Sequence, residues 1–213
     1  MNFNENLYST LKNTVMVDYS DCRVMVVSKN RPVDLIRSAI NSGQRLFGEN
    51  KVQEASSKFL ELRKEYDDID LHLIGPLQTN KTKLALDTFD TIQSIDREKL
   101  INEIIKKRTD LDRTKDFFIQ VNIGKETQKS GINPEDLENF YRYCISNKIN
   151  IKGLMCIPPN NLSPETFFRS MINLKNKINK ELLLSMGMSG DYMDALKIGS
   201  NLIRIGSAFF PNE

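Results

Sequence analysis

Short runs of apolar residues alternate along this chain with longer stretches in which apolar residues recur every three or four positions. The short runs are rich in Val, Ile, Leu and Phe and have the length of strands, so we interpret them as buried strands. The expected strands are eight in number: Val24–Ser28, Arg45–Gly48, Leu71–Gly75, Thr91–Ile95, Phe117–Ile123, Ile151–Ile157, Leu183–Met186 and Leu202–Ile205.

The stretches between these strands have helical spacing, for example from Leu137 through Phe140 and Tyr141 to Cys144. Several begin with proline and acidic residues, as in Ser163-Pro164-Glu165, which is typical of the first turn of a helix. An additional helix is expected ahead of the first strand, at about Glu5–Val15.

Eight strand–helix units in a chain of 213 residues fit an α/β fold, the (β/α)8 or TIM barrel. A doubly wound open sheet is the alternative, because the alternation alone does not reveal whether the sheet closes on itself. No low-complexity linker or change in composition divides the chain, so we expect residues 1–213 to form a single domain.

The composition is that of an ordinary globular protein, with 39% hydrophobic and 27% charged residues. The net charge is only +2, which argues against a general nucleic-acid binder. No apolar run is long enough to span a membrane, and the N-terminus lacks the pattern of a secretory signal. The three cysteines are unclustered, which favours reduced thiols and a cytoplasmic protein. With one histidine, a histidine-based metal site or a Ser–His–Asp triad is hard to build.

Lys29 follows the first apolar run and is the first candidate for covalent chemistry. In a barrel, ligands bind at the carboxyl ends of the strands, where this lysine lies. Burial there would lower the pKa of an amine and free its lone pair for reaction with a carbonyl group. The alternative is a strand-end lysine that extends to solvent, as most such lysines do.

Two segments near the end of the chain predict a site for an anion. Gly187–Asp191 follows the seventh strand and begins a helix, where backbone N–H groups and the Ser189 hydroxyl suit a phosphate. Gly206 and Ser207 follow the eighth strand, and the loops after strands seven and eight form the recurrent phosphate site of barrels. The alternative for the first segment is an ordinary loop whose serine or aspartate caps the helix. Together with Lys29, both segments suit an aldehyde that carries a phosphate.

Four further polar residues are candidates at the same strand ends. Arg204 lies between two isoleucines and would point opposite to them, toward a ligand inside the barrel, or it forms a structural salt bridge. Asn50 either donates to a ligand or caps a helix. His72 either packs near a cofactor or is a satisfied core histidine, and Lys129 either approaches a negative group or is solvated.

In this order, these motifs resemble the pyridoxal phosphate homeostasis protein family, whose members are stand-alone relatives of the alanine racemase N-terminal barrel. The resemblance covers about Val24 to Phe210 and is specific, because the strings Gly-Glu-Asn and Ser-Met-Gly-Met-Ser-Gly-Asp both occur. The matching segments are Val26–Lys29, Phe47–Glu54, His72–Lys81, Gln120–Ile123, Lys129–Gly131, Gly153–Met155, Leu184–Asp191 and Arg204–Ala208.

The resemblance implies that pyridoxal 5′-phosphate (PLP) is the cofactor. In the family, one lysine forms an aldimine with the cofactor, an arginine lies at the pyridine nitrogen, and serine and glycine residues bind the phosphate. A guanidinium at that nitrogen would keep it unprotonated and weaken carbanion chemistry on the ring. The implied positions are Lys29 for the aldimine, Ser189, Gly206 and Ser207 for the phosphate, Arg204 for the ring nitrogen, and Asn50 and His72 for the remaining pocket.

The chain departs from the family pattern at two positions. Ser207 stands where threonine is common, and a hydroxyl is kept. Leu71 stands where tryptophan is common, so we expect one wall of the pocket to be less bulky. Racemases with this barrel carry a second, β-rich domain that supplies a catalytic tyrosine to the partner subunit. We expect this chain, which ends at Glu213, to lack that domain.

The expected function is therefore that of a PLP-binding protein that holds the cofactor as a lysine aldimine and takes part in intracellular vitamin B6 homeostasis without turnover. PLP-dependent apo-enzymes are the expected partners, with neither nucleic acid nor membrane, and we expect a monomer. One alternative is a PLP-dependent amino-acid racemase. Another is a phosphosugar enzyme that uses Lys29 as a Schiff-base lysine.

Overall fold

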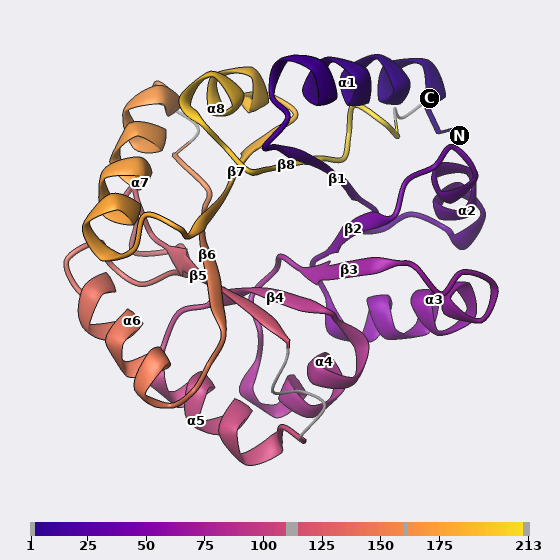
Figure 1. Ribbon diagram of the computed structural model, residues 1–213. Coiled ribbons are helices and arrows are strands. Elements are labelled where there is room, and N and C mark those ends of the chain that lie inside the picture. Colours follow the sequence, from indigo (N-terminus) through magenta and orange to yellow (C-terminus); the bar gives the residue numbers. More distant parts are fainter. Residues whose placement is uncertain (1–2, 110–114, 160–161, 211–213) are drawn as a thin grey trace.

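Eight parallel strands close into a barrel in the computed structural model, which describes residues 3–109, 115–159 and 162–210 (Figure 1). Each strand pairs with the next one along the chain, and β8 (Leu202–Ile205) pairs with β1 (Arg23–Val27). This last pairing confirms the predicted (β/α)8 barrel and excludes the doubly wound open sheet. The remaining strands are β2 (Leu46–Glu49), β3 (Asp70–Leu73), β4 (Thr91–Ile95), β5 (Asp116–Val121), β6 (Ile151–Cys156) and β7 (Leu183–Met188).

Helices surround the barrel, and each consecutive pair of strands is joined through one α-helix. The additional helix α1 (Glu5–Asp18) precedes β1 as expected and continues beyond Val15. In Figure 1 it lies outside β1 and β8. The other helices are α2 (Val33–Asn41), α3 (Val52–Glu65), η1 (Thr79–Lys81), α4 (Thr82–Thr88), α5 (Glu98–Lys107), α6 (Leu137–Ser146), α7 (Pro164–Ile178) and α8 (Tyr192–Ile198).

The strict alternation of strand residues separates two apolar layers. Val24 and Val26 of β1 belong to the large core between the barrel and its helices, whereas Met25 belongs to a smaller cluster inside the barrel. Glycines leave room for the large inner side chains, because a Cβ atom on Gly153 would lie 2.3 Å from Cε1 of Phe118. The barrel interior is therefore packed. The inner cluster consists of Met25, Leu46, Phe118, Met155 and Leu202.

The first and last described segments of the chain meet in a terminal aromatic cluster of Phe3, Tyr8, Phe209 and Phe210. The ring of Phe3 lies 5.4 Å from that of Tyr8 and 5.5 Å from that of Phe210, measured between centroids. The backbone N–H of Asn4 donates to the carbonyl oxygen of Phe209 at 2.9 Å. This cluster fixes the segment that follows β8 against the helix that precedes β1.

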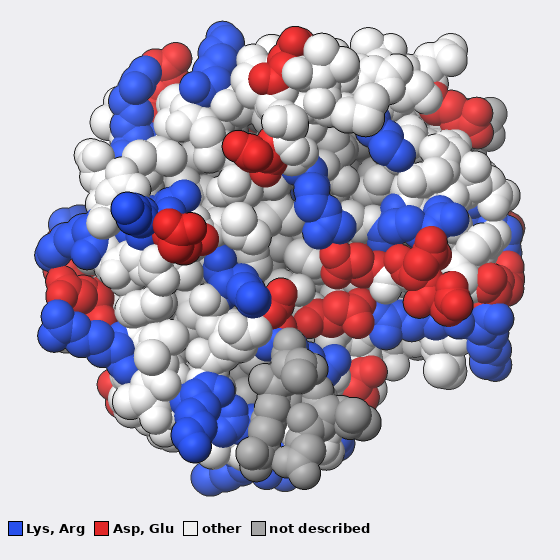
Figure 2. Space-filling view, viewed as in Figure 1, with Lys and Arg blue, Asp and Glu red and all other residues white. Residues whose placement is uncertain are grey.

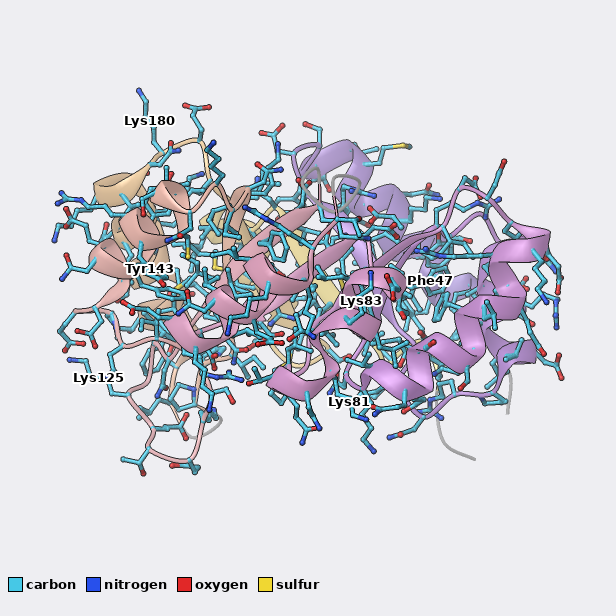
Figure 3. All side chains as sticks on the ribbon, turned by 90° about the horizontal axis from the view of Figure 1, so that it is seen from below. Phe47, Lys81, Lys83, Lys125, Tyr143 and Lys180 are labelled. Carbon is cyan, nitrogen blue, oxygen red and sulfur yellow. The ribbon has the colours of Figure 1, made fainter. Side chains whose placement is uncertain are left out.

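Figure 3 shows the two ends of the barrel from the side. Lys81 and Lys125, which follow β3 and β5, lie toward one end, and Lys180, which precedes β7, lies at the other. Phe47 lies between these ends and packs on Phe59 of α3, with the ring centroids 5.8 Å apart. We call the two ends the carboxyl-end face and the amino-end face, after the strand termini that they carry.

The surface shown in Figure 2 carries acidic and basic side chains interspersed with one another. A single basic field is not seen on this face, in keeping with the net charge of +2. Among the helices that the structure describes, none combines the length and the apolar character needed to pass through a bilayer.

Candidate functional site

A cavity of about 350 Å³ opens at the carboxyl-end face, a size suited to a small cofactor. Residues at or beyond the carboxyl ends of β1, β2, β3, β6, β7 and β8 form its walls. The apolar walls are Val27, Ile74, Ile157 and Met188. The cavity brings together six of the seven residues that the sequence suggested: Lys29, Asn50, Ser189, Arg204, Gly206 and Ser207.

Lys29 lies in the turn that follows β1 and lines this cavity. It is in phase with Met25 and Val27, which face the inside of the barrel, and Asn30 next to it has a left-handed φ of 57°. The lysine is exposed, so the expected burial at this position is not found. The strand ends at Val27, and the following turn carries the lysine beyond the packed layer.

The turn after β7 is closed by Asp191. Its Oδ1 accepts the backbone N–H of Met188 at 2.5 Å, and its own N–H donates to the Met188 carbonyl oxygen at 3.0 Å. Gly187 is required here, because it has a φ of 98° and a Cβ atom would lie 2.6 Å from Cβ of Ala195 in α8. Ser189 and Gly190 form the tip of the turn and line the cavity. Asp191 therefore stabilises the turn and makes no side-chain hydrogen bond as the cap of α8.

The turn after β8 lies beside it, since β7 and β8 are paired. The carbonyl oxygen of Gly206 accepts the N–H groups of Phe209 and Phe210 at 3.0 and 3.1 Å. A Cβ atom on Gly206 would lie 3.3 Å from Cβ of Val27, so glycine lets this turn pass close to β1.

The two turns present hydrogen-bond donors to the cavity. No described residue accepts a hydrogen bond from the backbone N–H groups of Ser189, Gly190, Ser207 or Ala208. The hydroxyl groups of Ser189 and Ser207 lie in the same turns. Such a group of outward N–H and O–H donors is suited to phosphate oxygens.

Arg204 points into the barrel, as its alternation with two isoleucines predicted, and its side chain is buried. Nη1 donates to the carbonyl oxygen and to Oγ of Ser185 at 2.7 and 2.8 Å, and Nη2 donates to the carbonyl oxygen of Cys156 at 2.8 Å. Nε has no acceptor among the described residues. Burial lowers the pKa of this guanidinium, which nevertheless stays charged in proteins. Its partners are neutral, so the alternative of a structural salt bridge is wrong within the described chain.

Asn50 follows β2 and lines the cavity. The N-cap of α3 is Lys51, so Asn50 does not cap that helix. Gly75 packs against the Asn50 backbone so closely that a Cβ atom would lie 2.2 Å from its carbonyl oxygen. Lys129 approaches a negative group, because it forms an ion pair with Glu126 at 2.6 Å, and it also donates to the carbonyl oxygen of Pro158.

His72 lies away from this cavity. The expectation that it packs near the cofactor in this pocket is therefore corrected. It pairs in register with Thr91, the first residue of β4, and lines a separate cavity of about 490 Å³ at the amino-end face. Its Nε2 lies 2.9 Å from Oδ1 of Asp70, and its Nδ1 lies 2.7 Å from Nε2 of Gln93. His72 is therefore a satisfied core histidine. The expectation that Leu71 forms a wall of the pocket is also wrong, because this residue packs in the layer between the barrel and the helices.

A buried ionic cluster behind Lys29 escaped the sequence analysis. We call it the Lys58 network; its members are Ser28, Glu49, Glu54 and Lys58. Nζ of Lys58 lies 2.6 Å from Oε1 of Glu49 and 2.9 Å from Oε1 of Glu54. The spacing of Glu54 and Lys58 by four residues on a helix was visible in the sequence. Their contact with Glu49 was not, because it joins a helix to the helix-facing side of a strand.

Two kinds of relative share this architecture. The family model for the alanine racemase N-terminal domain matches residues 4–211. An alanine racemase structure from E. faecalis superposes with a TM-score of 0.72 at 13% identity, over 98% of this chain and 58% of that one, and shows the fold alone. The chain is thus an alanine-racemase-type barrel.

Relatives of higher sequence identity indicate a particular family among the proteins with this barrel. The pyridoxal phosphate homeostasis proteins of Haemophilus influenzae and Aquifex aeolicus are 37% and 36% identical, over 88% of this chain and 84% and 86% of theirs. PipY of Synechococcus elongatus, solved without PLP, superposes with a TM-score of 0.87 at 32% identity, over 97% of this chain and 99% of that one. Its structure with PLP bound gives 0.84 at 31% identity, with the same coverage. The chain belongs to the pyridoxal phosphate homeostasis protein family.

Proposed function

We propose that this protein binds PLP reversibly through Lys29 and takes part in intracellular vitamin B6 homeostasis. The observation that carries the proposal is one cavity lined by a lysine and by two turns whose N–H donors have no acceptor among the described residues. PipY, at 31% identity, has been solved with PLP bound, which supports the same ligand here.

In this proposal, the polar residues of the cavity bind different parts of the cofactor. The N–H and O–H groups of Ser189, Gly206 and Ser207 with their neighbours bind the phosphate, and Asn50 donates to the ring hydroxyl. Arg204 is fixed by Ser185 and Cys156 so that its Nε faces the ring nitrogen. When bound, the cofactor supplies an aldehyde that condenses with a lysine amine and releases one water, without oxidation or reduction.

We further propose that the protein holds the cofactor without turnover. Lys29 and Arg204 are the ionisable side chains among the described residues that line the cavity. Removing a proton from one face of an amino acid and returning it on the other requires a second acid or base there. His72, which might have served, lies at the amino-end face. A racemase therefore remains the weaker reading.

The proposal includes a cytoplasmic monomer that supplies PLP-dependent apo-enzymes. The described cysteines, Cys22, Cys144 and Cys156, are free and buried, as expected in a reducing compartment. Burial raises the pKa of each thiol to about 12, so they stay protonated and unreactive.

The test is to add PLP to the protein, reduce the mixture with borohydride and map the modified lysine by peptide mass. The expected result is a visible absorption band before reduction and modification at Lys29. Lys29→Ala should lose both and keep its far-ultraviolet circular dichroism, whereas Lys129→Ala should keep them. Modification elsewhere in wild type, with Lys29 unmodified, would contradict the proposal. A phosphosugar enzyme would show no absorption band of this kind.

A further inference from the structure

Both peptide groups of Lys29 are hydrogen-bonded to the Lys58 network. The carbonyl oxygen of Ser28, which belongs to the peptide before Lys29, accepts a hydrogen bond from Nζ of Lys58 at 2.9 Å. The N–H of Asn30, which belongs to the peptide after Lys29, donates to Oε1 of Glu54 at 2.6 Å. The turn itself is closed by a hydrogen bond of 3.1 Å from the N–H of Arg31 to the Ser28 carbonyl oxygen.

The network is buried on the helix side of the barrel wall. The side chain of Glu49 is 0% exposed and that of Lys58 is 11% exposed. The ammonium of Lys58 has three protons and three close acceptors, which are Ser28 O, Glu49 Oε1 and Glu54 Oε1. Oγ of Ser28 adds a fourth link, because it donates to Oε1 of Glu49 at 2.7 Å. Ser28, Glu49 and Lys58 are thus each held by two or more members of the network, and Glu54 is held by Lys58.

The second carboxylate oxygen of Glu49 has no hydrogen-bond partner in the described structure, although it is buried. Burial raises the pKa of Glu49, and Lys58 and Ser28 act against that rise. A buried carboxylate with an unpaired oxygen is costly, so packing alone does not account for its place behind a functional turn.

We propose that Lys58 and Glu54 are positioning residues for Lys29. By fixing the peptide planes on both sides of this residue, they set the direction in which its side chain enters the cavity. Neither residue lines the cavity, so they act through Lys29. The inference rests on the proposed function of Lys29.

The first test compares Glu54→Ala with Glu54→Gln. This side chain is 24% exposed, so both variants should fold. Gln keeps an oxygen that accepts the Asn30 N–H, and Ala does not. The second test is the double variant E49L/K58M, which replaces the buried ion pair by apolar residues of similar size. It leaves the carboxylate of Glu54, which is 24% exposed, without its partner Lys58. Lys177→Met, at an exposed ion pair with Glu138, is the control for loss of a helix lysine.

A comparison of two ligands distinguishes a loss of Lys29 positioning from a general loss of the binding site. PLP binds covalently, whereas pyridoxine 5′-phosphate has the same ring and phosphate but an alcohol in place of the aldehyde. We expect E54A and E49L/K58M to weaken PLP binding about tenfold or more, the effect of losing one hydrogen bond to a charged group. Affinity for pyridoxine 5′-phosphate should be unchanged, and E54Q and Lys177→Met should bind PLP as wild type does.

Hydrogen exchange on the cofactor-free protein supplies a measurement that does not depend on PLP. In E54A and E49L/K58M, the amides of residues 28–31 should exchange faster, while those of the barrel strands keep their rates. Equal PLP binding in all variants, equal loss of both ligands, or unchanged exchange at residues 28–31 would each overturn the inference. If wild type forms no lysine adduct at all, the proposed function fails, and the exchange result alone decides whether the network positions the turn.

Discussion

At the scale of single residues, the proposed phosphate part of the candidate site consists of neutral donors. The turns that hold Ser189 and Ser207 contribute N–H and O–H groups, and the nearby cation, Arg204, uses its Nη atoms on Ser185 and Cys156. Phosphate affinity should therefore depend on the shape of two turns more than on the number of cations.

The phosphate donors give the first prediction. Ser207→Ala and Ser189→Ala should each lower the affinity for PLP about tenfold, because a hydrogen bond to a charged group contributes roughly 1.5–3 kcal/mol. Affinity for pyridoxal, which lacks the phosphate, should stay the same. Binding is followed by absorbance titration, with Ser57→Ala on the exposed side of α3 as the control. Equal losses for both vitamers would exclude a phosphate role for these serines.

Asp70 gives a prediction for acid stability. Burial acts to raise its pKa, but the hydrogen bond and charge of His72, together with Arg23, outweigh burial and hold the pKa below its ordinary value. A carboxyl group whose pKa is lower in the folded than in the unfolded protein stabilises the fold at pH values above its ordinary pKa. This contribution is lost as the pH falls through the pKa of the folded state. Asp70→Asn should thus cost on the order of 1 kcal/mol at pH 7.

That difference should disappear well below pH 4, where the carboxylate of the wild type is protonated as well. Urea unfolding of both proteins between pH 2 and pH 7 measures it. Asp116 lies close enough to Asp70 to interact with its charge. A difference that is constant with pH would show that the loss comes from packing and not from ionisation.

At the scale of elements, strand existence was easier to predict than strand ends. Thr91–Ile95 and Leu202–Ile205 were predicted to the residue. The fifth strand was expected to reach Ile123 but ends at Val121, because apolar character continues into a loop that is still buried. The hydrophobic pattern predicts which residues are buried. A strand, however, ends where its backbone hydrogen bonds to the neighbouring strands end.

The error for His72 comes from the register of the strands. The third strand was expected at Leu71–Gly75 and is found at Asp70–Leu73, and His72 pairs there with Thr91, the first residue of β4. Alternation predicts which side of the sheet a residue faces, but the end of the barrel that it approaches depends on the register with β2 and β4. The Lys58 network was missed because its contacts with the turn after β1 join residues 21 to 30 positions apart.

The inner glycines give a prediction for strand packing. Gly153→Val should destabilise the protein by about 1–3 kcal/mol, the usual effect of overfilling a packed interior. The added Cβ atom would lie 2.3 Å from Phe118 and 2.4 Å from the Leu183 carbonyl oxygen. Gly190→Ala is the control, since its Cβ atom would meet nothing within 4 Å. Chemical unfolding measures both, and a stable Gly153→Val would mean that the interior has spare room.

At the scale of the whole molecule, holding a reactive aldehyde and turning over amino acids make different demands on the same barrel. The protein loaded with PLP and incubated with L-alanine should produce no more D-alanine than free PLP does. One acid–base group is worth roughly 10²–10⁴-fold in rate, and the described walls of the cavity offer Lys29 without a second base opposite it.

Chiral chromatography of the products makes this measurement, with Lys29→Ala as the reference. D-alanine above the free-cofactor level in wild type, and not in Lys29→Ala, would establish a racemase.

The terminal aromatic cluster joins the proposed phosphate turn to the start of the chain. Phe209 and Phe210 follow Gly206 and Ser207 directly and pack on Phe3 and Tyr8. Binding that orders this turn should also hold α1 more firmly, and by reciprocity a loosened α1 should weaken the ligand. Limited proteolysis measures this effect, because bound PLP should slow cleavage near α1. Under this prediction, the protease sensitivity of the first helix would show whether the protein carries its ligand.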